Sequence, residues 1–141
     1  MIFTALKRTL LVALLLVSTS AMAEWVIIVH PSNQSVVDKR LVQNLYLGRT
    51  NEFADGQSAE PLDLNPREAL HEQFLRKVVR QRAVQYRRHW SQSLFTGGGE
   101  PPEQVASQME MVRRVSENPA MIGYVHSDQV TDSVRVVLRF Q

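Results

Sequence analysis

Trp-Val-Ile-Ile-Val-His, residues 25–30, is the stretch of this sequence that decides the fold. Its first five residues are apolar and four of them are β-branched, a composition that favours a strand. A short, unbroken apolar run is typical of a strand that is buried on both faces of its sheet. Pro31-Ser32-Asn33 follows directly and is typical of a loop. We therefore expect a buried strand here.

Upstream of this strand, residues 1–23 have the three-part pattern of a secretory signal peptide. Lys7 and Arg8 form a basic start, residues 10–17 are an unbroken run of Leu, Val and Ala, and Ala21-Met22-Ala23 has the form of a cleavage site. The apolar run of 8 residues is much shorter than the ~20 residues of a membrane-spanning helix. We expect a cleaved signal peptide; an uncleaved membrane anchor is the alternative.

Cleavage after Ala23 would leave residues 24–141 as one domain of 118 residues, which is long enough for a single core. The basic count falls from 16 to 14, equal to the 14 Asp and Glu residues, so the formal net charge becomes zero. A nucleic-acid-binding domain is expected to be basic, so we expect no nucleic-acid partner. There is no cysteine to form a disulfide or carry a lipid anchor. These features predict a soluble protein of the periplasm.

Capping residues and apolar spacing predict four helices after the first strand. Ser35 with Asp38, and Asn65 with Glu68, have the spacing of helix N-termini. Pro101-Pro102 is expected to open the last helix. The expected helices cover residues 35–48, 65–78, 82–96 and 101–118.

Three more strands are expected, over residues 60–64, 121–125 and 133–140. The order is then strand, helix, strand, three helices and two strands. This order indicates a single α/β domain in which helices flank one small mixed sheet.

The sequence contains no pattern that argues for catalysis. Cysteine is absent, and no Gly-x-Ser-x-Gly elbow surrounds a serine. The histidines are scattered, with no second histidine or carboxylate at a recognisable ligand spacing, and we interpret them as ordinary surface or hydrogen-bonded core residues: His30, His71, His89 and His126. We expect no enzyme activity, no metal and no cofactor.

Two features are candidate anion sites. Gly97-Gly98-Gly99 after Thr96 can present successive backbone N–H groups to an anion, although a flexible connector explains it equally. Arg67 lies in the first turn of the helix expected at Asn65, where free N–H groups point outward. A cation is unfavourable at the N-terminus of a helix. Arg67 therefore either binds an oxyanion through two guanidinium N–H groups or is an exposed residue without a role.

A basic cluster of six residues extends from the end of the second expected helix into the third. We interpret it as a solvated helix face, or as a docking surface for an acidic partner or for anionic lipid headgroups. Its members are Arg76, Lys77, Arg80, Arg82, Arg87 and Arg88.

Several segments, taken in order, resemble the phosphate-type substrate-binding proteins of ABC transporters. They are Val29-His30-Pro31-Ser32-Asn33, Leu45-Tyr46-Leu47-Gly48-Arg49, Phe74, Trp90 with Leu94-Phe95-Thr96-Gly97, and Asn118-Pro119-Ala120-Met121-Ile122-Gly123-Tyr124. The series is most similar to the small single-domain, PstS-like periplasmic proteins related to that family, over about residues 25–140. This resemblance implies a single lobe of a type II periplasmic-binding-protein-like (PBP-like) fold.

The chain departs from that family in two respects. Full phosphate-binding proteins close two lobes around the anion, whereas 118 residues resemble one lobe. Those proteins also carry a Ser-Gly-Thr turn that donates to phosphate. Aligned on the following Phe74, this chain has Asn65-Pro66-Arg67-Glu68-Ala69, in which proline has no N–H to donate.

The resemblance implies a periplasmic substrate-binding-protein-like domain that binds phosphate or another small oxyanion for ABC-type uptake or sensing. A membrane transporter or sensor protein would then be its partner. The alternative is a non-catalytic accessory or interaction protein that has lost ligand binding. The oligomeric state is left open. The candidate ligand contacts are Ser32, Asn33, Asn65, Arg67, Thr96, Gly97 and Gly98.

Overall fold

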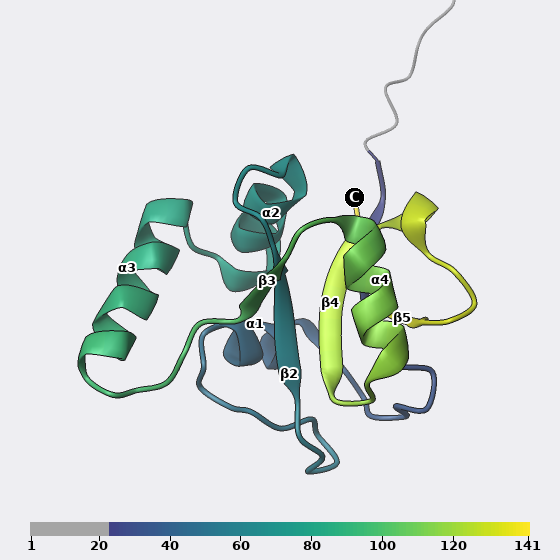
Figure 1. Cartoon of the computed structure of the whole chain (residues 1–141), viewed down its shortest axis with the longest axis horizontal. Coiled ribbons are helices and arrows are strands. Elements are labelled where there is room, and N and C mark those ends of the chain that lie inside the picture. Colours follow the sequence, from purple (N-terminus) through teal and green to yellow (C-terminus); the bar gives the residue numbers. More distant parts are fainter. Residues whose placement is uncertain (1–22) are drawn as a thin grey trace, which may run out of the picture.

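The computed structural model describes residues 23–141, and the expected signal peptide lies outside the described residues except for Ala23. Five strands form one mixed sheet in the order β3-β2-β4-β1-β5 (Figure 1). The strands are β1 (Trp25–Val29), β2 (Glu60–Leu64), β3 (Glu103–Val105), β4 (Met121–His126) and β5 (Arg135–Phe140). The helices are α1 (Lys39–Tyr46), α2 (Ala69–Phe74) with the π-helical turn η1 (Leu75–Val79), α3 (Ala83–Phe95), α4 (Gln108–Glu117) and the short 3₁₀ turn η2 (Ser127–Gln129).

The predicted buried strand is confirmed as β1. All five of its residues are 0% exposed. It pairs antiparallel with β4 on one side and with β5 on the other. Beyond β4, strands β2 and β3 run parallel to one another, and β2 runs parallel to β4. The predicted mixed sheet and α/β class are therefore confirmed.

Helices cover both faces of the sheet. Successive residues of a strand point to opposite faces, and β4 shows which helix lies on which. The ring of Tyr124 stacks on Phe74 of α2 with centroids 3.9 Å apart, and Phe74 in turn meets Tyr46 of α1 at 4.6 Å. Gly123 lies under the side chain of Met111 in α4. Helices α1 and α2 therefore cover one face, and α4 covers the other.

Three of the four predicted helix starts are wrong, and two of them lie at polar residues that precede the true N-cap. Asp38, not Ser35, caps α1, and its carboxylate accepts from the backbone N–H of Leu41 at 2.7 Å. Asn65 does not cap α2 either. Its side-chain oxygen accepts from the backbone N–H of Arg67 at 3.0 Å, which closes a turn outside the helix.

The helix predicted from Pro101-Pro102 is also wrong at its start. Residues 103–105 form the edge strand β3, which pairs parallel with β2. Helix α4 begins only at Gln108, where the Ser107 hydroxyl accepts from the backbone N–H of Glu110 at 3.1 Å. A three-residue edge strand has too few residues to show a period in the sequence, and pairing with β2 decides its conformation.

Candidate functional site

Helix α3 stands apart from the rest of the molecule and is attached along one narrow stripe (Figure 1). The Tyr86 hydroxyl donates to the backbone oxygen of Tyr46 at 3.2 Å, and His89 Nε2 lies 2.8 Å from the backbone oxygen of Leu47. The Trp90 ring packs on Gly48, where an added Cβ would lie only 2.6 Å from the ring. Gly48 has φ +71°, so this position needs glycine for its backbone as well.

The chain returns from α3 to β3 through residues 98–104, and two adjoining cavities border this return segment. The first, called the α3 cleft here, has a volume of about 640 Å³ and lies against α3. Its walls include Tyr86, Trp90 and Leu94 of α3 together with Pro101 and Pro102. This size and the aromatic and proline walls are typical of small-molecule sites.

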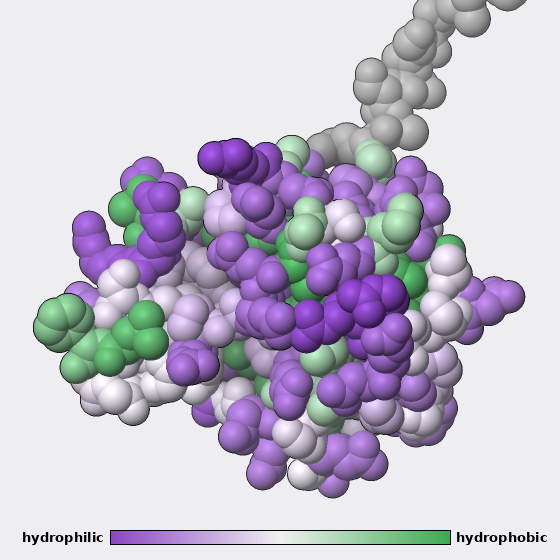
Figure 2. All heavy atoms as spheres, viewed as in Figure 1, coloured by the Kyte–Doolittle hydropathy of each residue, from purple (hydrophilic) through white to green (hydrophobic). Residues whose placement is uncertain are grey.

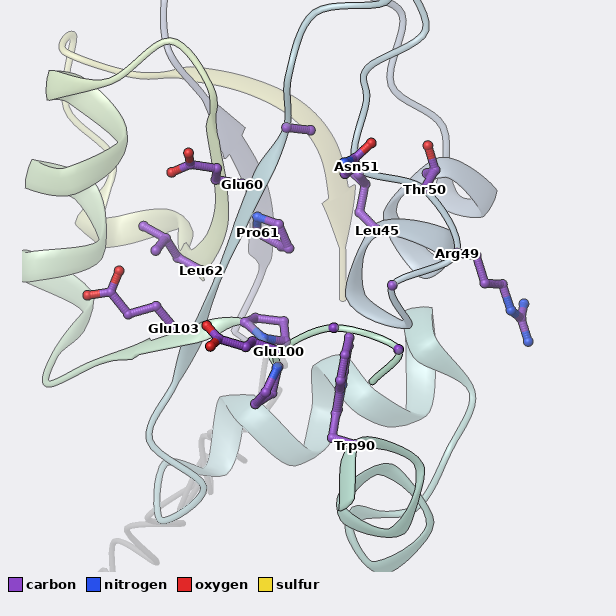
Figure 3. Close-up of a pocket in the computed structure, with 16 residues that line it drawn as sticks. Leu45, Arg49, Thr50, Asn51, Glu60, Pro61, Leu62, Trp90, Glu100 and Glu103 are labelled. Carbon is purple, nitrogen blue, oxygen red and sulfur yellow. The ribbon is translucent and has the colours of Figure 1, made fainter. Parts of the chain in front are cut away.

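The second cavity has a volume of about 570 Å³ and lies against the start of β2. Figure 3 shows Trp90, Glu100 and Glu103 beside it, and these three residues also line the α3 cleft. Arg49 is at the rim, and its guanidinium points away from the other labelled side chains (Figure 3). The two cavities therefore adjoin one another, and residues 98–104 form part of the wall of both.

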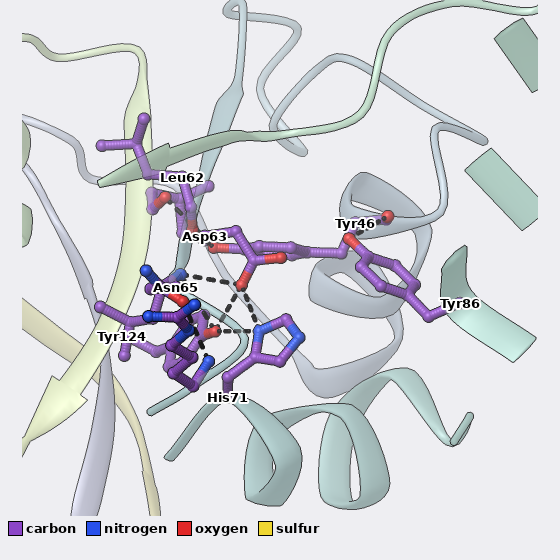
Figure 4. A network of polar contacts seen from close by, with 10 residues as sticks. Tyr46, Leu62, Asp63, Asn65, His71, Tyr86 and Tyr124 are labelled. Carbon is purple, nitrogen blue, oxygen red and sulfur yellow. Dashed lines mark hydrogen bonds and ion pairs between the residues drawn. The ribbon is translucent and has the colours of Figure 1, made fainter. Parts of the chain in front are cut away.

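A buried polar network underlies the α3 cleft (Figure 4). Asp63 of β2 and His71 of α2 both line the cleft, yet they are only 2% and 4% exposed. His71 Nδ1 lies 3.0 Å from Asp63 Oδ1, and the same oxygen accepts from the Tyr124 hydroxyl and from the backbone N–H of Leu64. Three donors thus hold the buried carboxylate in place, which a buried charge requires.

The pKa values of the surrounding tyrosines keep their hydroxyls protonated. Burial raises the pKa of Tyr46 and Tyr124 well above the usual tyrosine value, and the nearby Asp63 charge raises it further. The pKa of Tyr86 is raised by the same two causes. All three phenols therefore act as hydrogen-bond donors: Tyr46 to the backbone oxygen of Leu62 at 2.6 Å, Tyr124 to Asp63, and Tyr86 to Tyr46.

The network leaves one nitrogen of His71 available. Because an ionised Asp63 can only accept, the proton shared with it sits on Nδ1 of His71. The second ring nitrogen, Nε2, points away from Asp63 (Figure 4) and has no hydrogen-bond partner among the described residues. A neutral His71 would offer Nε2 to a solute as an acceptor, and a protonated one would offer it as a donor.

The charges that line the α3 cleft are mainly negative. Asp63, Glu100 and Glu103 face it, and Arg87 is the cation at its rim. Arg114 lies 2.7 Å from Glu103, and this pairing lowers the pKa of Glu103. The α3 cleft is therefore a poor environment for a phosphate dianion.

Two of the three glycine N–H groups predicted to bind an anion at the end of α3 already donate to backbone oxygens of the helix. Gly98 donates to the backbone oxygen of Ser93 at 2.7 Å, Gly97 donates to that of Leu94, and Thr96 donates to that of Gln92. The first two bonds form the Schellman motif that ends α3. Residues 96–98 are thus a helix C-terminus with its donors satisfied.

The other four predicted contacts lie at opposite edges of the sheet. Ser32 and Asn33 follow β1, whose last residue pairs with Ile122 near the start of β4. Asn65 and Arg67 follow the end of β2, which runs parallel to β4. The two groups are separated by about one five-residue strand, or ~17 Å, so the structure does not bring them together. Ligand binding by any of the seven residues stays a prediction.

The sequence interpretation missed the pairing of Asp63 with His71. The sequence predicts that His71 is either an ordinary surface residue or a hydrogen-bonded core residue, and the structure places it in the core. Its carboxylate partner lies eight residues earlier, on a strand. A strand-to-helix pair has no fixed spacing, so no motif identifies it. A buried aspartate in the apolar strand Leu62-Asp63-Leu64 was the available signal.

Within residues 23–141, no helix combines the length and the apolar character needed to cross a membrane. Over the same part of the chain, no three His, Asp or Glu side chains come close enough together to hold a metal ion.

The fold is similar to solved phosphate-transport receptors. An ABC-type phosphate transport receptor from Vibrio cholerae matches with a TM-score of 0.57 and 15% identity, over 82% of this chain and 46% of that one. A putative phosphate ABC transporter substrate-binding protein from Clostridium perfringens, solved with bound phosphate, matches with a TM-score of 0.64 and 15% identity, over 82% and 45%. PstS from Borrelia burgdorferi matches with a TM-score of 0.58 and 10% identity, over 82% and 47%.

The chain has a PstS-like fold. It spans about half the length of the solved structures that it matches, which confirms the predicted single lobe of a PBP-like fold. At these identities the likeness concerns the fold alone. No family model and no curated protein matches the sequence.

Proposed function

We propose that this chain is a non-enzymatic solute-binding module built on one PstS-like lobe, and that its solute enters the α3 cleft. The carrying observation is the Asp63–His71 pair at the base of a cavity of about 640 Å³ with aromatic and proline walls. Solute sites combine apolar walls with a few fixed polar groups. Asp63 on β2 and His71 on α2 supply such groups, and the Tyr124 hydroxyl contacts both of them.

The cleft favours a neutral or cationic solute with an apolar body. Trp90, Leu94 and the two prolines would pack on that body, and His71 Nε2 would meet one polar atom. Glu103 is already neutralised by Arg114, whereas the Glu100 carboxylate at the rim has no ion-pair partner among residues 23–141 and suits a positively charged group. We propose that the module acts in the periplasm, where residues 1–23 would deliver it, and passes its solute to a membrane transporter or sensor.

Phosphate is the second candidate solute, bound at Arg67. The C. perfringens protein of similar fold contains phosphate, and Arg67 is exposed, with no ion-pair partner within the described residues. Against this candidate, Asp63 is a buried carboxylate near the end of the preceding strand β2, and Glu68 occupies the N-cap of α2. Both carboxylates repel an anion.

Thermal unfolding with a solute panel separates the two candidates. The panel contains phosphate, sulfate, the common amino acids and simple aromatic and aliphatic amines. A true ligand at 100 times its Kd adds about 2.7 kcal/mol to the free energy of unfolding. We expect a saturable rise in the midpoint with an amino acid or amine, reduced in Glu100→Gln and retained in Arg67→Gln.

Glu100→Gln and Arg67→Gln form a matched pair, because both residues are exposed and each change removes one charge. If phosphate alone raises the unfolding midpoint, and Arg67→Gln abolishes that rise, then phosphate bound at Arg67 is the solute and the α3 cleft proposal is wrong. If no member of the panel raises the midpoint, the α3 cleft does not bind solutes of these classes, and the interaction-protein alternative replaces the proposal.

A further inference from the structure

The basic cluster shares only Arg87 with the α3 cleft, so solute binding does not account for the rest of it. Its six members are all exposed and fall on η1, on the link to α3 and on the first half of α3: Arg76, Lys77, Arg80, Arg82, Arg87 and Arg88. None of them forms an ion pair with any residue in the range 23–141. Of the eight other Lys and Arg residues in that range, three have acidic partners: Arg113, Arg114 and Arg139. Six cations in succession therefore remain uncompensated.

The same segment carries exposed apolar side chains on its outer face. Val84 is 56% exposed, and Phe95, at the far end of α3, is 95% exposed. At 100° per residue, Val84, Arg88 and Phe95 project within about 40° of one another. The buried residues Tyr86 and Trp90 lie on the opposite side of the helix. Figure 2 shows hydrophobic atoms gathered at the lower end of α3, with hydrophilic atoms at its upper end.

We propose that residues 76–95, here called the basic arm, dock on an anionic lipid surface. The cations would lie among the headgroups, and Phe95 would enter the interface. Lipid headgroups attract such clusters by about 1 kcal/mol for each Lys or Arg near the surface. An aromatic side chain beside cations is also typical of interfacial helices.

The shape of the arm favours a lipid surface over an acidic protein. Helix α3 projects from the body (Figure 1), and its outer face is a convex helix surface rather than a groove. Both cavities lie on its inner side, towards residues 98–104. A projecting helix with a fully exposed phenylalanine at its end suits a broad, deformable layer of negative charge.

Vesicle binding by residues 24–141, the form expected after cleavage of the signal peptide, tests this proposal. We would compare vesicles of phosphatidylglycerol mixed with phosphatidylcholine against phosphatidylcholine alone, at low and at physiological salt. We expect preference for the anionic vesicles, weakening with salt. The triple variant Arg76→Gln/Lys77→Gln/Arg88→Gln removes three headgroup contacts and should bind on the order of 100-fold more weakly.

The matched control is Lys39→Gln/Arg113→Gln/Arg139→Gln, which removes the same charges from exposed positions outside the arm. It should keep most of the preference. Phe95→Ser should weaken binding, whereas Val36→Ser, at a residue 80% exposed outside the arm, should not. Equal losses in both triple variants would overturn the proposal by showing an effect of net charge alone.

Two further outcomes would also overturn it. Equal binding to both kinds of vesicle, insensitive to all variants, would show partition through residues outside the arm. Binding to polyglutamate without any preference for anionic vesicles would assign the arm to an acidic protein partner. None of these variants changes a residue placed in the α3 cleft, so the solute test remains independent.

Discussion

Strand β1 and helix α3 are opposite extremes of this molecule. All five residues of β1 are fully buried, and hydrogen-bonded strands lie on both sides. Helix α3 is more than twice as long, yet only Tyr86 and Trp90 of its 13 residues are buried. Burial of apolar surface stabilises the fold, so β1 contributes to the core along its whole length and α3 contributes at two residues. The contrast shows that α3 is attached to the rest of the fold only through the side that carries Tyr86 and Trp90, so its other sides are available for binding.

The largest expected effect comes from a matched pair of truncations. Ile27→Ala in β1 leaves a cavity in the core and should lower the free energy of unfolding by about 2–5 kcal/mol. Val84→Ala on the outer face of α3 should change it by less than about 0.5 kcal/mol. Urea unfolding followed by circular dichroism measures both. Equal effects would contradict the division between body and α3.

An intermediate effect is expected where the two regions meet. Gly48→Ala forces a side chain into the left-handed region and against the Trp90 ring. We expect a loss of about 1–3 kcal/mol in the free energy of unfolding, with faster amide exchange in α3 than in the wild type. Gly56→Ala is the matched control, because Gly56 also has positive φ but an added Cβ would meet nothing within 4 Å. A larger loss in Gly56→Ala would contradict this account of the contact.

The buried tyrosines predict an effect on stability that is absent at neutral pH and develops only at alkaline pH. Their pKa values are raised in the folded state, so their contribution is fully present below the unfolded value of ~10 and is lost as pH rises through the folded values. Stability should be flat up to about pH 10 and then fall, by up to about 1.4 kcal/mol per pH unit for each tyrosine. Denaturant unfolding between pH 8 and 11.5 measures this slope.

Tyr86→Phe removes one of the three phenols and should reduce that alkaline slope by about a third. The slope should fall without a change in stability between pH 7 and 9 beyond the loss of one hydrogen bond, about 1 kcal/mol. An unchanged slope would show that Tyr86 already ionises in the folded protein, contrary to its burial.

The sheet could be predicted from the sequence because its strands carry local signals. The apolar run of β1 and the segment before Tyr124 identified two central strands, and Gly48 and Thr96 marked the ends of α1 and α3. The edge strand β3 carried no such signal, since three residues between prolines and a helix cap have no period. Its conformation depends on pairing with β2.

The candidate site could be predicted only in part. The glycine run after α3 was correctly placed at a helix end, but the anion interpretation required free N–H groups, and the Schellman bonds of Gly97 and Gly98 use them. The turn at Asn65 was expected to be helical, and a single side-chain hydrogen bond to Arg67 makes it non-helical. Which of two local hydrogen bonds forms depends on tertiary packing.

Native-state hydrogen exchange tests the central claim most directly, because it measures the opening of α3 and of the sheet in one experiment. The account predicts that the amides of β1 and β4 exchange only through global unfolding, with the full free energy of unfolding. The amides of α3 should exchange through a local opening of distinctly lower free energy, and Gly48→Ala should lower it further. Equal protection of α3 and β1, unchanged by Gly48→Ala, would contradict the claim that α3 opens independently of the sheet.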